Sequence, residues 1–351
     1  MKRSLCYALL FLSLSCEVRP AKDQRGPAPK QEPKTIPAPP ESMVVVPPEP
    51  IKPKTTPGIP EGALGEAMSY SLPNATGLFV IDIERLAKSA MLGPVLAQVP
   101  TWVGSDAAWR ELISKAGLDP LRDLRGVVAS FRQPTGGTTE ILMTFVGTFD
   151  AAAISKAMHD STTRGESDAV LVGKNILLVG KTPLLAEAKL AAERGLLVDA
   201  PLMLAALSGL DVTRPVYGAF FPPAATRAAA HGSERANQVT TEFDASQELY
   251  LKILFHFDTP KEAEDSKVEL DDALKQMGPM MGIFGIPDTS ALLKAFVIKT
   301  DGARLSFLLS LDSTTAATII AGVARFSGGA AVSPAPAPVP PPAPAPVLPP
   351  G

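Results

Sequence analysis

Apolar and polar residues follow the same order in two long stretches of the chain. Residues 127–158 and 238–270 each contain an alternating segment, a polar turn, a longer apolar segment, and Phe-Asp before a helical pattern. Alternation with a period of two is typical of half-buried strands, and a period near 3.6 is typical of amphipathic helices. Each stretch therefore predicts a strand pair followed by a helix, and strands joined by short turns pair antiparallel.

A further strand pair and a further helix are predicted after each of these two stretches. Gly173-Lys174-Asn175 and Asp301-Gly302 interrupt apolar runs with residues that favour tight turns, so both predict hairpins. The next helices are expected to begin at Thr182-Pro183 and at Asp312.

Acidic residues also mark the preceding helix starts. Asp150 and Asp258 follow the two Phe residues, where a carboxylate would accept hydrogen bonds from the first helical amides as an N-cap. Pro260 then falls in the first helical turn, where its missing N–H costs least.

Each half also opens with a strand and a helix, so both halves predict the order β-α-β-β-α-β-β-α. We place the first repeat at 76–207, with an additional helix near 105–120, and the second at 214–327. The predicted fold class is α+β, with antiparallel sheets covered by helices. In this pattern the chain resembles uncharacterised two-repeat envelope proteins of bacteria, a family without a catalytic motif to transfer. The alternative is a chance likeness between simple patterns.

The N-terminal segment has the pattern of a secretory signal. Lys2 and Arg3 precede an apolar run from Leu5 to Leu14, which is shorter than the roughly 20 residues a membrane-spanning helix needs. The following Ser13-Leu14-Ser15-Cys16 resembles the lipobox of bacterial lipoproteins. That resemblance implies that residues 1–15 are a signal peptide, that cleavage leaves Cys16 first, and that its sulfur is diacylated.

Cysteine usage agrees with a lipid anchor at Cys16. The only other cysteine is Cys6, inside the predicted signal, so Cys16 would have no partner for a disulfide or a zinc site. The resemblance then places the protein in a bacterial cell envelope, with the outer membrane favoured. An ordinary secretory signal and a cytoplasmic protein are the alternatives.

Proline separates the predicted repeats from both ends of the chain. Most of the 36 prolines lie in 16–75 and 328–351, which are expected to be a polyproline-like linker and an Ala/Pro-rich tail without a packed core. The tail is either a spacer or a segment that binds a polyproline-recognising partner or threads the cell wall.

Charge and motif content exclude several classes of function. The net charge is −3 with no basic stripe, which argues against nucleic-acid binding. Gly180-Lys181-Thr182 lacks the earlier glycine of a phosphate-binding loop, and no two of His159, His231 and His256 are spaced as a zinc pair. We therefore expect no cofactor, no metal site and no catalytic residues.

One helix carries a row of acidic residues. Glu262, Asp265, Glu269 and Asp272 recur at i, i+3, i+7 and i+10. Such a row is usually the solvated face of a helix, and metal binding is the lesser alternative.

A methionine-rich segment is the candidate contact site. Residues 275–288 are strongly apolar and contain three glycines and two prolines, which predict a loop between a helix and a strand. The segment is either a buried plug or an exposed contact surface for a partner, lipid or hydrophobic ligand. The candidate contact residues are Met280, Met281, Ile283, Phe284 and Ile286.

The sequence thus favours a non-enzymatic lipoprotein, held at a membrane through Cys16, that acts as an envelope binding or structural module. Its partner would be an envelope protein, the cell wall or a hydrophobic ligand. A carrier of hydrophobic ligands is the alternative function, and a hydrolase is the third.

Overall fold

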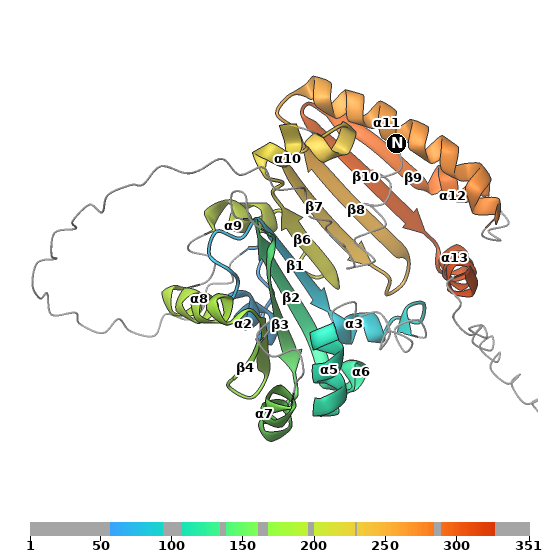
Figure 1. The fold of residues 1–351 in the computed structure, drawn as a ribbon. Coiled ribbons are helices and arrows are strands. Elements are labelled where there is room, and N and C mark those ends of the chain that lie inside the picture. Colours follow the sequence, from blue (N-terminus) through green and yellow to red (C-terminus); the bar gives the residue numbers. More distant parts are fainter. Residues whose placement is uncertain are drawn as a thin grey trace, which may run out of the picture. The chain divides into compact units, whose positions relative to one another are not determined.

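The computed structural model describes residues 57–93, 107–133, 138–160, 168–195, 200–228, 230–283 and 289–326. Within these ranges the chain forms ten strands, eleven α-helices and one 3₁₀ helix (Figure 1). The predicted α+β class is confirmed. No helix within these ranges is long and apolar enough to cross a membrane.

The described elements up to residue 213 come first in the chain. They are α2 (Ala63–Met68), β1 (Gly77–Asp82), α3 (Ile83–Ala87), α5 (Ala107–Ala116), α6 (Pro120–Asp123), β2 (Leu124–Arg132), β3 (Glu140–Gly147), α7 (Ala151–His159), β4 (Asp168–Val172), β5 (Ile176–Gly180), α8 (Thr182–Arg194) and α9 (Pro201–Ser208).

The elements after residue 213 follow. They are β6 (Val216–Phe220), α10 (Ala224–Ala228), the 3₁₀ helix η2 (Gly232–Arg235), β7 (Gln238–Asp244), β8 (Leu249–His256), α11 (Pro260–Ile283), α12 (Thr289–Ala295), β9 (Phe296–Asp301), β10 (Arg304–Leu311) and α13 (Ser313–Phe326).

The strands are ordered β4-β5-β3-β2-β1-β6-β7-β8-β10-β9. The first five strands therefore have the order β1-β2-β3-β5-β4, and the last five have the corresponding order β6-β7-β8-β10-β9. Neighbouring strands whose residue pairing is defined run antiparallel, for example β4 with β5 and β9 with β10. The chain divides into two compact units, one made mainly of residues 128–213 and the other mainly of residues 214–351.

Local signals placed the hairpins and two helix starts correctly. Gly173 and Gly302 have φ values of 60° and 58° in the turns after β4 and β9, a backbone conformation that glycine adopts without steric cost. Asp150 accepts from the amides of Ala152 and Ala153 as the N-cap of α7. Asp312 likewise accepts from Thr314 and Thr315 at the start of α13.

The predicted N-cap at Asp258 is wrong. Thr259 Oγ1 instead accepts from the Glu262 amide at 3.2 Å, and Glu262 Oε2 accepts from the Thr259 amide at 3.1 Å. This is a reciprocal capping box, which satisfies two amides at the start of the helix. Asp258 is engaged instead with Arg227 at 2.9 Å and Asn237 at 2.7 Å.

The folded part begins before residue 76, which corrects the expected 16–75 linker. Helix α2 lies inside that range, and Ala67, Met68 and Leu72 are fully buried. The Leu72 amide also donates to the buried Ser130 Oγ at 3.1 Å. Apolar side chains thus fix residues 63–75 to the first unit despite the nearby prolines.

The predicted loop at 275–288 is also corrected in part. Helix α11 continues to Ile283 and passes through Gly278 and Pro279. Glycine and proline each disfavour a helix by a local cost, and tertiary packing of the long preceding helix can outweigh that cost. Residues 284–288 lie outside the described residues.

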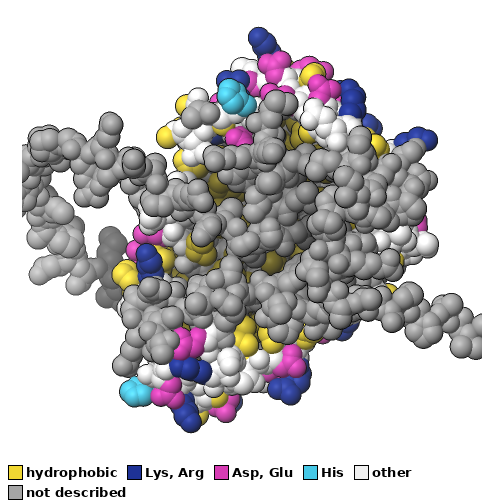
Figure 2. All heavy atoms as spheres, turned by 45° about the vertical axis from the view of Figure 1, so that its right-hand side comes forward, with side chains coloured by type: hydrophobic (Ala, Val, Ile, Leu, Met, Phe, Trp, Pro, Cys, Tyr) yellow, Lys and Arg dark blue, Asp and Glu magenta, His cyan; other side chains and the backbone are white. Residues whose placement is uncertain are grey.

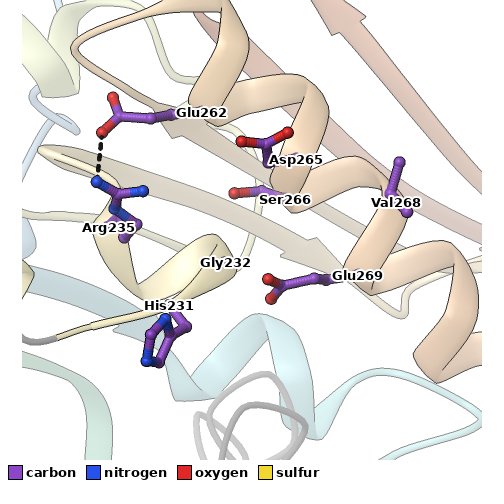
Figure 3. A pocket seen from close by; sticks show the side chains of 8 residues that line it. All are labelled: His231, Gly232, Arg235, Glu262, Asp265, Ser266, Val268 and Glu269. Atoms are coloured by element: carbon purple, nitrogen blue, oxygen red, sulfur yellow. Dashed lines mark ion pairs between the residues drawn. The ribbon is translucent and has the colours of Figure 1, made fainter.

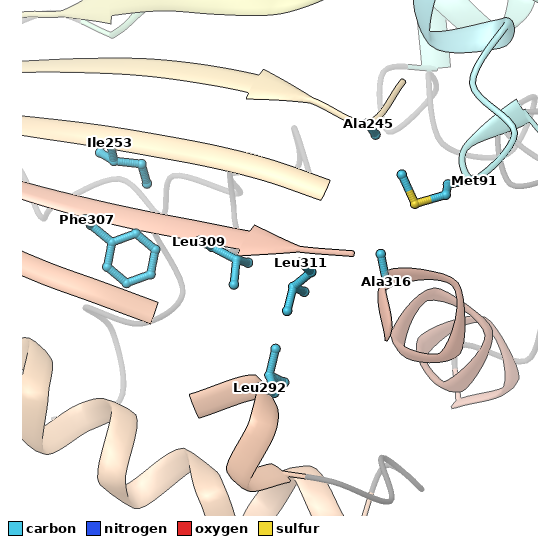
Figure 4. Close-up of a cluster of buried hydrophobic side chains, with 8 residues drawn as sticks. All are labelled: Met91, Ala245, Ile253, Leu292, Phe307, Leu309, Leu311 and Ala316. Atoms are coloured by element: carbon cyan, nitrogen blue, oxygen red, sulfur yellow. The ribbon is translucent and has the colours of Figure 1, made fainter. Parts of the chain in front are cut away.

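Each unit has its own core. In the first unit, Leu72 packs with residues of β3, β5 and α8, including Leu142, Leu178 and Leu185. In the second unit, alternate residues of β10 are buried on the side of the sheet that faces the helices. They belong to a cluster of buried apolar side chains that Figure 4 shows. Its buried members are Met91, Ala245, Ile253, Leu292, Phe307, Leu309, Leu311 and Ala316.

Candidate functional site

A cleft in the second unit lies between η2 and α11 (Figure 3). Its volume is about 370 Å³. Six of its eight lining residues have charged or polar side chains, whereas the lining of an apolar ligand cavity is mostly hydrophobic and aromatic. The lining residues are His231, Gly232, Arg235, Glu262, Asp265, Ser266, Val268 and Glu269.

Helical spacing brings the α11 residues to one wall of the cleft. Glu262, Asp265, Ser266 and Glu269 follow the i, i+3, i+4, i+7 pattern of a single helix face. The opposite wall is the short η2 helix, which packs against α11. Figure 3 shows Glu269 directed toward Gly232.

Gly232 permits this close approach. Its φ is 57°, and a Cβ at this position would overlap the Glu269 carboxylate. A side chain at this position would therefore be strained in its backbone and would displace Glu269. The glycine keeps the Glu269 carboxylate against the backbone of η2.

The single guanidinium of the cleft is already paired. Arg235 Nη2 lies 3.1 Å from Glu262 Oε1, and the Glu262 side chain is only 19% exposed. The other oxygen of Glu262 accepts from the Thr259 amide at 3.1 Å. Both carboxylate oxygens of Glu262 therefore already have partners, which are the Arg235 guanidinium and the Thr259 amide.

Two carboxylates of the cleft have no partner among the described residues. Asp265 and Glu269 are exposed and form no hydrogen bond or ion pair with the described part of the chain. Three carboxylates face one guanidinium, so the cleft has an excess of negative charge.

Several neighbouring charged side chains on α11 have, by contrast, a partner within the described chain. Lys267 pairs with Asp271 at 2.9 Å, and Lys275 pairs with Asp272 at 3.0 Å. Glu264 accepts from Thr300 at 2.9 Å. Asp265 and Glu269 therefore differ from these neighbours in having neither a cation nor a hydrogen-bond donor from the described chain beside them.

A buried hydroxyl also belongs to the cleft wall. Ser266 is 1% exposed, and its Oγ has no hydrogen-bond partner within the described chain. In Figure 3 this oxygen lies on the side of α11 that faces η2. Burying a hydroxyl without a partner costs roughly 1–3 kcal/mol, so Ser266 is an unsatisfied polar group beside two unpaired carboxylates.

The geometry suits binding of a positively charged group. The described residues contain no group of three or more His, Cys, Asp or Glu side chains placed to hold a metal ion. The cleft's negative charges and its unsatisfied oxygen would favour a cation with hydrogen-bond donors.

The lipid-attachment residue and the candidate contact segment are not brought to this cleft. Cys16 lies outside the described residues. Met280, Met281 and Ile283 belong to the last turns of α11, beyond the cleft residues along the helix. Phe284 and Ile286 fall outside the described residues.

The three histidines lie on different elements. His159 ends α7, His231 precedes η2, and His256 ends β8. Burial, followed by the charge of Arg304, lowers the pKa of His256. His231 is the one histidine in the cleft lining.

The described surface carries both signs of charge. Figure 2 shows basic and acidic side chains interspersed among the described residues of one face.

Comparison with protein-family models found no match, and comparisons with curated proteins and with solved structures found none either.

The acidic row is visible in the sequence, but the cleft beside it is not. Glu262, Asp265 and Glu269 are the same residues that the spacing placed on a solvated face. Their role changes because η2 packs beside them. Ser266, a small polar residue inside this row, was the local signal that could have drawn notice.

Proposed function

We propose that this protein is a non-enzymatic lipoprotein, anchored through Cys16, whose folded part acts as a binding module of the bacterial envelope. The observation that carries the anchor is the apolar run ending at Cys16, with no later cysteine in the sequence. Two or three acyl chains would make such an anchor stable, whereas a single chain gives only marginal membrane binding.

The binding role rests on the η2–α11 cleft. An open cleft with unpaired Asp265 and Glu269 beside the buried Ser266 hydroxyl offers charge and hydrogen-bond acceptors to a ligand. A carrier of hydrophobic ligands would need a largely apolar cavity. The charged lining of this cleft therefore favours the binding module over the carrier.

We further infer that 76–207 and 214–327 are two copies of one unit. Each contains the order β-α-β-β-α-β-β-α with additional helices, and the two sets of five strands have corresponding positions in the strand order. A duplication would explain both the shared order of elements along the chain and the shared order of strands in the sheet. Chance would have to produce these two similarities separately.

The anchor is tested by changing each cysteine in turn in a bacterial host. Cys16→Ala should abolish incorporation of labelled palmitate and release the protein from salt-washed membranes. Cys6→Ala is the matched control, because that residue lies in the predicted signal, and it should leave labelling unchanged. Equal labelling and retention of the Cys16→Ala protein would refute the anchor.

A further inference from the structure

The η2–α11 cleft offers three oxygen acceptors that nothing in the described chain satisfies. They are the carboxylates of Asp265 and Glu269 and the Oγ of Ser266. Ser266 is the decisive member, since it is 1% exposed and still unpaired. A row of exposed acids alone would be an ordinary solvated surface.

The number and type of acceptors match one kind of cation. A primary ammonium group has three N–H donors and no acceptor. Two carboxylates and one hydroxyl would supply one acceptor for each donor, and charge-assisted bonds of this kind are roughly twice as strong as neutral ones.

Other cations fit the cleft less well. A divalent metal is usually held by three or more carboxylate, imidazole or thiolate side chains, and the described residues contain no such group. A quaternary ammonium has no N–H donor and is usually held by aromatic rings, whereas the lining contains no Phe, Tyr or Trp.

The rest of the lining suits an aliphatic chain attached to that ammonium. Val268 lies beside Glu269 on α11 and is 53% exposed. The paired Arg235 and Glu262 form a charge-neutral part of the wall. A volume of about 370 Å³ leaves room for more than the ammonium group itself.

We infer that the η2–α11 cleft binds the ammonium group of an aliphatic primary amine between Ser266, Asp265 and Glu269. This inference rests on the proposed role as a binding module and names the chemical class of its ligand. In the bound state the Ser266 Oγ accepts one N–H, and the two carboxylates accept the others and neutralise the charge.

The test uses the full-length chain in detergent, with butylammonium as the probe. Binding is followed by NMR through the amide signals of Gly232 and Ser266 as the probe concentration rises. Butylammonium should shift these signals saturably. Neutral 1-butanol and tetramethylammonium, which lack the charge and the N–H donors respectively, should not.

Two charge-removing variants identify the carboxylates. Asp265→Asn and Glu269→Gln should each weaken butylammonium binding about tenfold or more, because each removes a charge-assisted hydrogen bond. Asp272→Asn is the matched control. It removes the same charge from the same helix, but Asp272 lies outside the cleft and pairs with Lys275, so binding should change by less than about twofold.

Ser266→Ala separates a ligand-binding role from a structural one. Removing an unsatisfied buried hydroxyl should leave the urea midpoint unchanged or raise it, while butylammonium binding weakens. A variant that binds butylammonium as the parent does would show that this hydroxyl does not contact the ligand, and would overturn the inference.

Two further results would also overturn it. They are the absence of any saturable shift with butylammonium, and equal binding of tetramethylammonium. Palmitate labelling at Cys16 is scored separately. Labelled protein that fails to bind butylammonium refutes only the ligand class, and unlabelled protein that binds it refutes only the anchor.

Discussion

Replacing Leu72 with alanine tests whether the chain before residue 76 belongs to the folded unit. Leu72 is 1% exposed and packs with Leu142, Leu178 and Leu185. The change removes about three carbon groups, a loss of roughly 2.4 kcal/mol at ~0.8 kcal/mol each. The cavity left behind adds to this, so we expect a total cost of about 2–5 kcal/mol in the free energy of unfolding.

The measurement is urea unfolding followed by circular dichroism. The midpoint should fall while the slope m stays constant, which indicates a change in stability alone. In thermal unfolding, each 1 kcal/mol should correspond to roughly 2–4 °C for a unit of this size.

Leu190→Ala is the matched control for the same chemical change. Leu190 lies on α8 and is 56% exposed, so its truncation should cost less than about 0.5 kcal/mol. A Leu72→Ala protein as stable as the Leu190→Ala protein would refute the placement of Leu72 in the core. Residues 57–75 would then be linker, as the sequence alone predicts.

Two further predictions concern the second unit. Thr259→Ala should lower the free energy of unfolding by about 1 kcal/mol through loss of the hydroxyl acceptor for the Glu262 amide, and Thr259→Ser should restore most of it. His256 has a lowered pKa through burial and the nearby Arg304, so the unfolded chain takes up its proton near pH 6.5 before the folded chain does. Stability should therefore fall as pH drops below about 6.5. In urea midpoints measured at several pH values, His256→Gln should reduce this slope, and a slope equal to that of the parent protein would contradict the assignment.

The hairpins could be predicted from the sequence because their signals are local. The positive φ at Gly173 and Gly302 requires only the residue itself, and the antiparallel pairing follows from the short turn. Asp150 and Asp312 cap their helices for the same reason, since the acceptor and the amides are within three residues.

The predictions that differed depended on tertiary packing. Asp258 is recruited by Arg227 and Asn237, which are distant in sequence, so the cap moves to Thr259. Residues 63–75 include apolar residues such as Leu64, Met68 and Leu72, but the stretch is too short to show a clear period, and only the assembled first unit shows that Met68 is buried. The many prolines just before this stretch therefore placed the predicted end of the linker too late, at residue 75.

The cleft shows why an acidic row has no fixed meaning in a sequence. Asp272 behaves as the spacing predicts, with a side chain 56% exposed and paired to Lys275. Glu262, ten residues earlier on the same helix, is 19% exposed and holds Arg235. The difference arises because η2, a four-residue segment about thirty positions upstream, packs beside one end of α11 and not the other. Hydrophobic periodicity cannot report that contact, because η2 is too short to have a period. Among the side chains that line the cleft, Ser266 is the one that is buried without a hydrogen-bond partner in the described chain, and the spacing of the acidic row does not show this burial.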